Sequence, residues 1–250
     1  MRSRSTRSRF THALLAIMDG KHHWAWEQFA TGRLTPAQLK IHFQQEYAVY
    51  VRDFPVFLAR IHGKNPPTSV RRMLAENIYE EDTGGLSLGK SHPALFLEMM
   101  EGLGFGSNDF EHIRLLPAAR RYRAWLDRMS NHKQWVLGAA ALTVFVEGSV
   151  KDRAELTEPS KPKTPEEIEA VIAKHPLVQH HGLSPDRMDL IRAHQAVEAG
   201  HRHDAYDMVV NHATTRAQQQ AVVACVKQCL TLWLAYRDAV AKACGIRKGR

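Results

Sequence analysis

The chain has 250 residues, of which 44% are hydrophobic and 24% are charged, and its formal net charge is +8. This composition is ordinary for a soluble globular protein. No apolar run approaches the roughly 18 residues that are needed to cross a bilayer, and residues 1–10 lack the apolar stretch and cleavage site of a secretory signal. We therefore expect a cytoplasmic protein with no membrane partner.

Much of the positive charge lies at the two ends of the chain, and we expect residues 1–8 and 244–250 to be mobile basic tails. No nucleic-acid motif accompanies this charge, so we expect no nucleic-acid partner. The three cysteines are Cys225, Cys229 and Cys244. An odd number without a secretory context predicts reduced, structural thiols.

Apolar residues at helical spacing predict helices along almost the whole chain. Typical start signals, such as Thr35-Pro36 and Ser184-Pro185, precede several of them. Loops are predicted at the glycine- and proline-rich stretches, among them residues 157–164, and residues 175–183 are expected to be irregular. No stretch alternates as a β-strand would, so residues 1–250 are expected to form a single all-α domain, a bundle of about seven or eight helices. The main expected helices cover residues 9–30, 36–62, 68–82, 92–103, 117–130, 133–150, 185–203 and 204–243, the last with room for a break, and two short helices are expected at 107–111 and 166–174.

The predicted helix over residues 190–201 carries His194, Glu198 and His201, which are four and seven residues apart. At about 100° per residue, these positions fall on nearly the same helix face. Imidazole and carboxylate groups are ligands that iron, zinc and manganese accept. The alternative is an exposed polar face in a histidine-rich chain, which has 15 His.

Two further acids stand in otherwise apolar surroundings. Glu147 follows the apolar run 139–146, and a buried carboxylate is costly unless it is paired or binds a metal. Glu46 is flanked by aromatic residues at helical spacing. The alternatives are that Glu147 is simply the first polar residue near a helix end and that Glu46 lies on the surface.

A third acidic position is the Glu80-Glu81 pair at the end of the predicted helix 68–82. A glycine-rich loop follows this pair and leads to His92. Such a loop can return a histidine to the preceding acid and so complete a pair of metal ligands. The alternative is a solvated acidic helix end, and the spacing leaves open whether Glu80 or Glu81 is the ligand.

Taken in chain order, the acids and histidines resemble the metal ligands of the haem-oxygenase-like diiron oxidases and oxygenases. The order is Glu46, Glu81, His92, Glu147 and then the triplet of His194, Glu198 and His201. This superfamily shares its fold with pyrroloquinoline quinone synthase and thiaminase II-like proteins. Residues 77–81 and 91–96 are similar to that superfamily's acid–loop–histidine block, and Phe54-Pro55 is similar to its second-helix ending. The resemblance extends over about residues 26–211. The chain departs from the pattern at Glu198, where the superfamily usually has Asp, and in the longer segments between Glu81 and His92 and between Glu147 and the following histidines.

The resemblance implies two iron ions per chain, one of them labile, with O2 as co-substrate. It implies a peroxo-type intermediate that oxidises a small organic substrate, which is an amine, an amino acid or a carboxylic acid. It also implies a homodimer and an external electron donor. Glu147 is the implied bridge, while Glu46 and Glu81 are the other catalytic carboxylates. The implied metal ligands are Glu46, Glu81, His92, Glu147, His194, Glu198 and His201.

Three alternatives remain for the function. A cofactorless oxidase similar to pyrroloquinoline quinone synthase would not need the carboxylates, and a thiaminase-like hydrolase would need an activated cysteine. A non-catalytic helical binding protein would keep the site only as a relic. Tyr47, Tyr50 and Tyr79 flank the ligands and are candidates to orient the carboxylates or to be oxidised, the alternative being a packed aromatic lining. Arg52, Lys151 and Arg153 are candidates to hold a substrate carboxylate, the alternative being ordinary surface charge.

Overall fold

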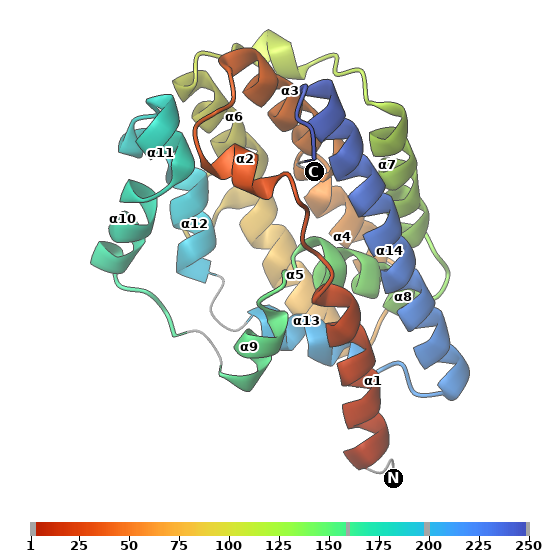
Figure 1. Cartoon of the computed structure of the whole chain (residues 1–250). Coiled ribbons are helices and arrows are strands. Elements are labelled where there is room, and N and C mark those ends of the chain that lie inside the picture. Colours follow the sequence, from red (N-terminus) through yellow and green to blue (C-terminus); the bar gives the residue numbers. More distant parts are fainter. Residues whose placement is uncertain (1–3, 159–160, 198–200, 249–250) are drawn as a thin grey trace.

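The computed structural model describes residues 4–158, 161–197 and 201–248, and the side chains of residues 4–6 and 201 are not described (Figure 1). Every regular element of these residues is a helix and none is a strand, which confirms the all-α prediction. The predicted number of seven or eight helices is too low, because kinks and turns divide several predicted segments. The α-helices are α1 (Arg4–Met18), α2 (Trp26–Ala30), α3 (Pro36–Glu46), α4 (Phe54–His62), α5 (Thr68–Thr83), α6 (His92–Gly102), α7 (Pro117–Ser130), α8 (Trp135–Ala139), α9 (Asp152–Thr157), α10 (Pro165–Ala173), α11 (Pro176–His181), α12 (Asp189–Val197), α13 (His201–Val210) and α14 (Arg216–Ala243). The other helices are the π-helices η1 (Tyr47–Val51) and η3 (Ala140–Val146) and the 3-10 helices η2 (Ser107–Phe110) and η4 (Pro185–Arg187).

The predicted helix 9–30 is interrupted after Met18. The chain turns there, and the ammonium group of Lys21 reaches the carbonyl oxygens of Phe145, Val146 and Gly148. A continuous helix would not leave Lys21 free to make these contacts. The segment therefore forms the separate helices α1 and α2.

Two predicted helices contain a π-helical turn. In residues 36–62 the turn is η1, and the chain then breaks at Arg52 before Pro55 in the first turn of α4. Proline has no backbone N–H to continue the preceding helix, so a new start is favoured at this point. In residues 133–150 the π-helical turn is η3, which directly follows α8.

The second half of the chain holds two helices that the sequence did not predict, α9 and α11. In α11, Pro176 occupies the first turn and the His175 ring accepts a hydrogen bond from the Leu177 backbone N–H at 3.2 Å. The expected helix 185–203 begins with the 3-10 helix η4 and continues as α12 after Met188, and residues 198–200 lie outside the described part of the chain. The structure describes α12 up to Val197, packed on α6 and α10, and α13 from His201, packed on η3, α8 and α9.

Residues of both expected tails make contacts with the rest of the chain. Helix α1 begins at Arg4, and the Arg7 guanidinium lies 3.0 Å from Asp207. At the other end, Cys244 is buried and its carbonyl accepts a hydrogen bond from Gln38 at 2.5 Å. Residues 1–3 and 249–250 lie outside the described part of the chain.

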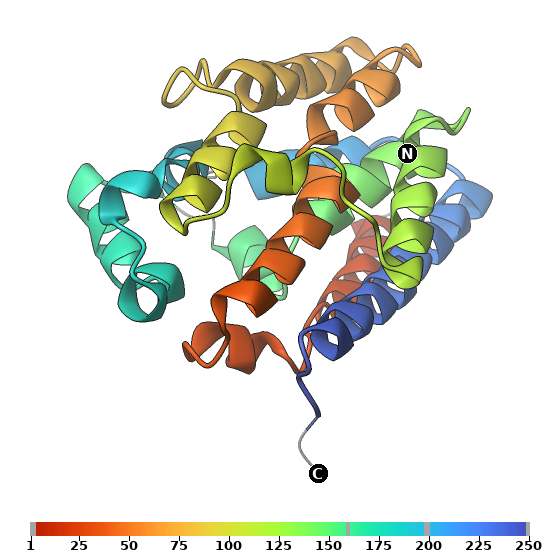
Figure 2. The same cartoon turned by 90° about the horizontal axis from the view of Figure 1, so that it is seen from above.

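The core has two parts. The larger part surrounds η3 and the long helix α14, which runs beside α1 and α7 (Figures 1 and 2). The smaller part is formed by α3, α6 and α10–α12, and α10 and α11 lie on the side of the molecule away from α14 in both views. Within the described ranges, no helix is both long enough and apolar enough to cross a membrane. Side chains of both cores line the cavity described next.

Candidate metal centre

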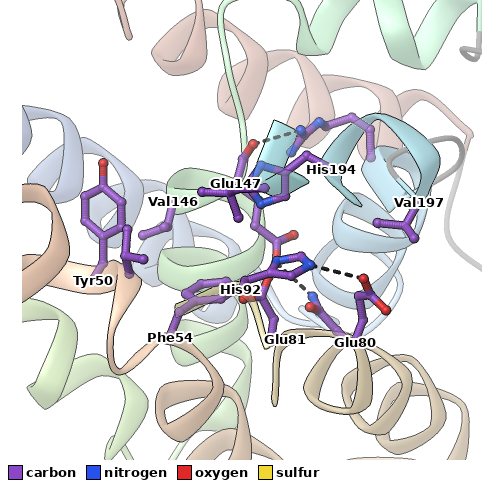
Figure 3. A pocket seen from close by; sticks show the side chains of 13 residues that line it. Tyr50, Phe54, Glu80, Glu81, His92, Val146, Glu147, His194 and Val197 are labelled. Atoms are coloured by element: carbon purple, nitrogen blue, oxygen red, sulfur yellow. Dashed lines mark hydrogen bonds and ion pairs between the residues drawn. The ribbon is translucent and has the colours of Figure 1, made fainter. Parts of the chain in front are cut away.

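A cavity of about 240 Å³ lies where the two cores meet (Figure 3). The last turns of α5 bring Glu80 and Glu81 to it, the first residue of α6 brings His92, and α12 brings His194. The end of η3 brings Glu147. Five residues from four segments of the chain thus meet at one cavity, and all five belong to the segments singled out by their acids and histidines.

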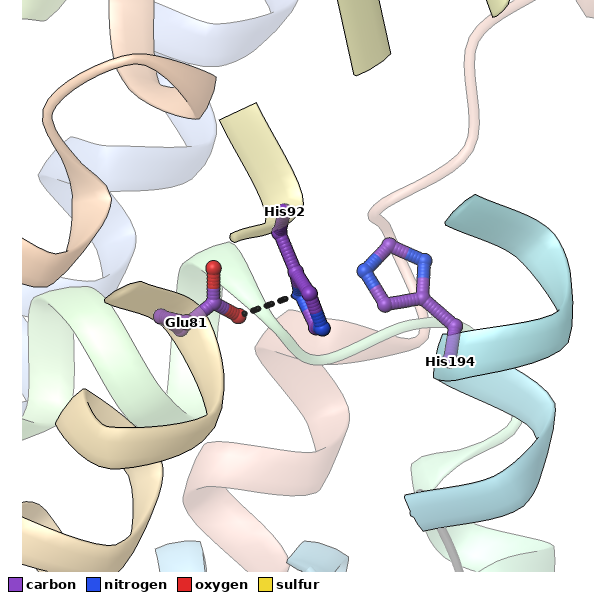
Figure 4. A group of neighbouring side chains, drawn as sticks. All are labelled: Glu81, His92 and His194. Atoms are coloured by element: carbon purple, nitrogen blue, oxygen red, sulfur yellow. Dashed lines mark ion pairs between the residues drawn. The ribbon is translucent and has the colours of Figure 1, made fainter. Parts of the chain in front are cut away.

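Three of these side chains converge on one point, Glu81, His92 and His194 (Figure 4). One potential ligand atom from each lies within 4.8 Å of the others. His92 Nδ1 lies 3.1 Å from a Glu81 carboxylate oxygen, and the His92 and His194 rings are 4.8 Å apart at 80° to one another. One carboxylate and two imidazoles therefore surround a common space.

The carboxylate of Glu80 is held by hydrogen bonds from the following loop and from His92. Its carboxylate accepts hydrogen bonds from the Leu86 backbone N–H at 2.7 Å, from the Ser87 hydroxyl, and from His92 Nε2 at 3.1 Å. Burial raises the pKa of Glu80, but the hydrogen bonds from Ser87, Leu86 and His92 outweigh it and keep the pKa below its usual value. Glu80 thereby holds the loop and the His92 ring, and it leaves Nδ1 of that ring directed to Glu81.

His194 is in the protonation state that a metal requires. Burial, and secondarily the neighbouring His92, lowers the pKa of His194 to about 4. The ring is therefore neutral near pH 7 and keeps a free lone pair.

Glu147 lies on the wall of the same cavity but outside the convergent group. Its carboxylate accepts a hydrogen bond from the Asn77 amide at 2.8 Å, and its backbone carbonyl accepts one from Arg202 at 2.8 Å. These two contacts fix both ends of the residue directly after η3. π-Helical turns are frequent at functional sites.

Glu46 is placed differently from the expectation. It does not line this cavity; one of its oxygens accepts a hydrogen bond from the Tyr50 hydroxyl and the other lies 3.1 Å from His42 Nε2. Burial opposes ionisation, but His42 and the more distant Arg237 lower the pKa of Glu46 to about 2. Glu198 lies outside the described residues, as does the His201 side chain, so their ligand roles stay predictions.

The groups that are described fit an iron ion. Carboxylate oxygen and imidazole nitrogen are the donors that iron accepts. His92 Nδ1 is buried and has no hydrogen bond, since its contact with Glu81 is not aligned as one. A metal ion at this point would satisfy that nitrogen, while Glu80 on the other ring nitrogen would orient the imidazole.

A larger cavity of about 490 Å³ adjoins the first and shares Tyr50, Val51, Leu190 and His194 with it. Its walls are mainly aromatic and aliphatic, and they include Trp26, Phe29, Phe43, Phe96 and Met99. Sequence periodicity identified such positions only as interior. The larger cavity has the size and character of a small-molecule site.

Most of the other candidate residues are placed away from the two cavities. Tyr79 is 52% exposed, and Tyr47 stacks on Phe96 with ring centres 5.3 Å apart. Arg52 pairs with Asp53 and Arg153 pairs with Asp19 near the surface, while Lys151 is exposed. Of the candidate tyrosines, Tyr50 lines both cavities.

The three cysteines have the environment of structural thiols. All are buried and free of disulfides. The Cys229 sulfur accepts a hydrogen bond from Trp125, the Cys225 thiol donates to the Leu137 carbonyl, and burial raises the pKa of Cys244 to about 11. A raised pKa opposes the thiolate that a thiaminase-like reaction would need.

Comparison with known proteins gives similarities in sequence and in fold. A family described as iron-containing redox enzymes matches residues 41–234. The 4-aminobenzoate synthases of Chlamydia muridarum and Chlamydia trachomatis are 27% and 26% identical to this chain over 136 residues. These matches cover 53% of this chain and 56% and 57% of the relatives, so the chain spans about half the length of each relative.

Two solved structures resemble nearly the whole chain. A TenA homologue from Pseudomonas syringae has a TM-score of 0.68 and 14% identity, with 95% of this chain and 92% of that chain covered. A Shewanella denitrificans domain of unknown function with a haem-oxygenase-like fold has a TM-score of 0.63 and 18% identity, with 97% and 93% covered. The predicted haem-oxygenase-like fold is confirmed by these similarities.

Proposed function

We propose, from the premise that this chain belongs to the family of iron-containing redox enzymes, that it is an iron-dependent oxidase or oxygenase acting with O2 on a small organic substrate. The observation that carries the proposal is the convergence of Glu81, His92 and His194 beside a larger apolar cavity. The convergent group offers the donors of an iron site, and the apolar cavity offers space for an organic molecule.

The proposed site holds two iron ions. Glu81, His92 and His194 would hold the first, and Glu147, Glu198 and His201 would complete a second, more labile position. His194 is assigned to the first position because its ring lies with Glu81 and His92 in the convergent group. Bound iron would supply the electrons and the open coordination position that O2 chemistry requires. Glu46 is left out of this ligand set because its carboxylate is held by His42 and Tyr50.

The surrounding residues have defined tasks in this proposal. Glu80 fixes the tautomer and direction of the His92 ring. Asn77 and Arg202 fix the carboxylate and the backbone of Glu147. The aromatic walls of the larger cavity exclude water and orient the substrate toward His194, which both cavities share.

The first test is anaerobic loading of the full chain with ferrous iron, followed by rapid mixing with O2 while the visible spectrum is recorded. We expect about two irons per chain and a transient absorption band. His92→Ala and His194→Ala should lose iron, whereas His62→Ala, which is not part of either cavity, should load normally. Failure of the wild-type chain to take up iron would overturn the proposal and favour the cofactorless oxidase.

Related expectations can be tested on the same preparation. The named activity of the Chlamydia relatives makes 4-aminobenzoate one product to assay, together with oxidised amines and amino acids. Consumption of O2 only when a reductant is added would support the proposed external electron donor. The mass in solution would test the proposed homodimer.

A further inference from the structure

We propose that the polar end of the larger cavity is a binding site for an amino group, formed by Glu46 and His42, so that the substrate is a primary amine with an apolar body. This inference rests on the proposed function for its meaning as a substrate site, but the binding itself needs neither iron nor O2. It also gives Glu46 a task other than holding metal.

Glu46 can accept further hydrogen bonds. Its pKa of about 2 means that it is ionised near neutral pH. Tyr50 donates to one oxygen and His42 approaches the other. A carboxylate has about four lone-pair positions, so these two contacts leave room for the N–H groups of a ligand.

His42 supplies a second acceptor. Because its Nε2 faces the ionised Glu46, the proton of the ring belongs on that nitrogen. Burial lowers the pKa of His42, so the ring is neutral and Nδ1 is unprotonated. Nδ1 is buried, lacks a hydrogen-bond partner, and belongs to a residue that lines the cavity. A buried acceptor without a donor is unfavourable, and a ligand N–H would remove that cost.

The walls of the cavity suit the same ligand. Aromatic rings of Trp26, Phe29 and Phe43 line it, and their faces attract a cation as well as an apolar body. Among the described residues that line it, no lysine or arginine is present. The nearby Arg237 is stacked on the Trp26 ring at 4.1 Å and is not a lining residue. An amine is therefore favoured over a carboxylate at this end.

The site is placed correctly for a reaction at the iron centre. Tyr50 lines both cavities and contacts Glu46, and His194 belongs to both cavities and to the convergent group. A molecule whose amino group lies at Glu46 therefore extends its body along the aromatic walls toward His194.

The test compares two probes of similar shape, 2-phenylethylamine and 3-phenylpropionate, by titration calorimetry with the full chain before and after anaerobic iron loading. We expect the amine to bind about ten-fold more tightly than the carboxylate, which corresponds to one charge-assisted contact. Equal or tighter binding of the carboxylate would overturn the proposal and point to Arg237 as the recognition group.

Variants assign the effect to the two acceptors. Glu46→Gln should weaken amine binding about ten-fold and leave the iron content unchanged. His42→Phe, which keeps an aromatic ring against Phe29, should weaken binding to a smaller extent. Glu27→Gln removes a charge from an exposed position next to Trp26 and should bind like the wild type. Loss of iron in Glu46→Gln would return Glu46 to the metal ligands and overturn the proposal, whereas failure of the wild-type chain to load iron would leave the binding result intact.

Discussion

The two π-helices place two carboxylates by different means. η1 begins directly after Glu46, and η3 ends directly before Glu147. The partners of Glu46, His42 and Tyr50, are four residues away on either side. The hydrogen bonds to Glu147 come from Asn77 and Arg202, which are 70 and 55 residues away. Similar backbone turns thus serve one locally supported acid and one acid that depends on the tertiary structure.

The end of η3 has a further long-range support. Lys21 donates hydrogen bonds to the carbonyl oxygens of Phe145, Val146 and Gly148 at 2.6, 3.0 and 2.5 Å. A helix end leaves carbonyl groups without intrahelical partners, and at this partly buried terminus Lys21 supplies the donors. The loop after α1 therefore holds the backbone on both sides of Glu147 through Lys21. The carboxylate beside η1 does not depend on a long-range contact of this kind.

Replacement of Lys21 should give the largest effect. Lys21→Met leaves three carbonyl groups without a buried donor, at about 1–3 kcal/mol for each lost partner. We expect the free energy of unfolding to fall by about 4 kcal/mol, as measured by urea denaturation. Lys64→Met, at an exposed loop position, should change it by less than about 0.5 kcal/mol. A similar loss in both variants would contradict the support of η3 by Lys21.

The local support of Glu46 predicts a dependence on pH. Its folded-state pKa of about 2 lies below the ordinary value of 4.5. The stabilisation is therefore complete above pH 4.5 and is lost as the pH falls toward 2, with an upper limit of about 3 kcal/mol. Urea denaturation of the wild type and Glu46→Gln between pH 7 and pH 3 should show the difference shrinking at low pH. A constant difference would contradict the stabilisation of the ionised Glu46 carboxylate by its hydrogen-bond donors.

Asn77 tests the long-range support of the Glu147 side chain alone. Asn77→Ala removes the amide donor and should cost about 1–2 kcal/mol of the free energy of unfolding. Because the orientation of Glu147 changes, the iron content should also fall below that of the wild type. Asn131→Ala is the matched control, since that exposed amide donates only to a backbone carbonyl of α7. Unchanged iron content in Asn77→Ala would show that the carboxylate needs no such support.

The comparison also explains what could be predicted from sequence. The i, i+4 pairs around Glu46 and the apolar run before Glu147 are local patterns, and so is the acid–loop–histidine block that contributes Glu81 and His92 to the convergent group. The contacts of Lys21 and Arg202 depend on how α1 and α13 pack on η3. No local pattern encodes that packing, and the predicted helix 9–30 therefore ran through Lys21.

Some of the missed features did have a signal. His175-Pro176 repeats the cap-and-proline arrangement of Thr164-Pro165, and both begin a helix. This arrangement would have predicted a helix at α11, which contributes Leu177 to the larger cavity. No such signal predicted that Glu46 lies away from the convergent group. Glu46 is the last residue of the regular helix α3, and the π-helical turn η1, which changes the direction of the chain, begins only at the next residue.

Tyr50 should give the smallest effect. Tyr50→Phe removes one of two donors to Glu46 while the other, His42, and the packing of the ring remain. The loss in the free energy of unfolding should be about 1 kcal/mol, and amine binding should change less than in Glu46→Gln because the carboxylate keeps its charge. Urea denaturation and calorimetry of the same preparation measure both quantities. A cost comparable with that of Lys21→Met would mean that the acid beside η1 depends on the tertiary structure as strongly as the acid beside η3.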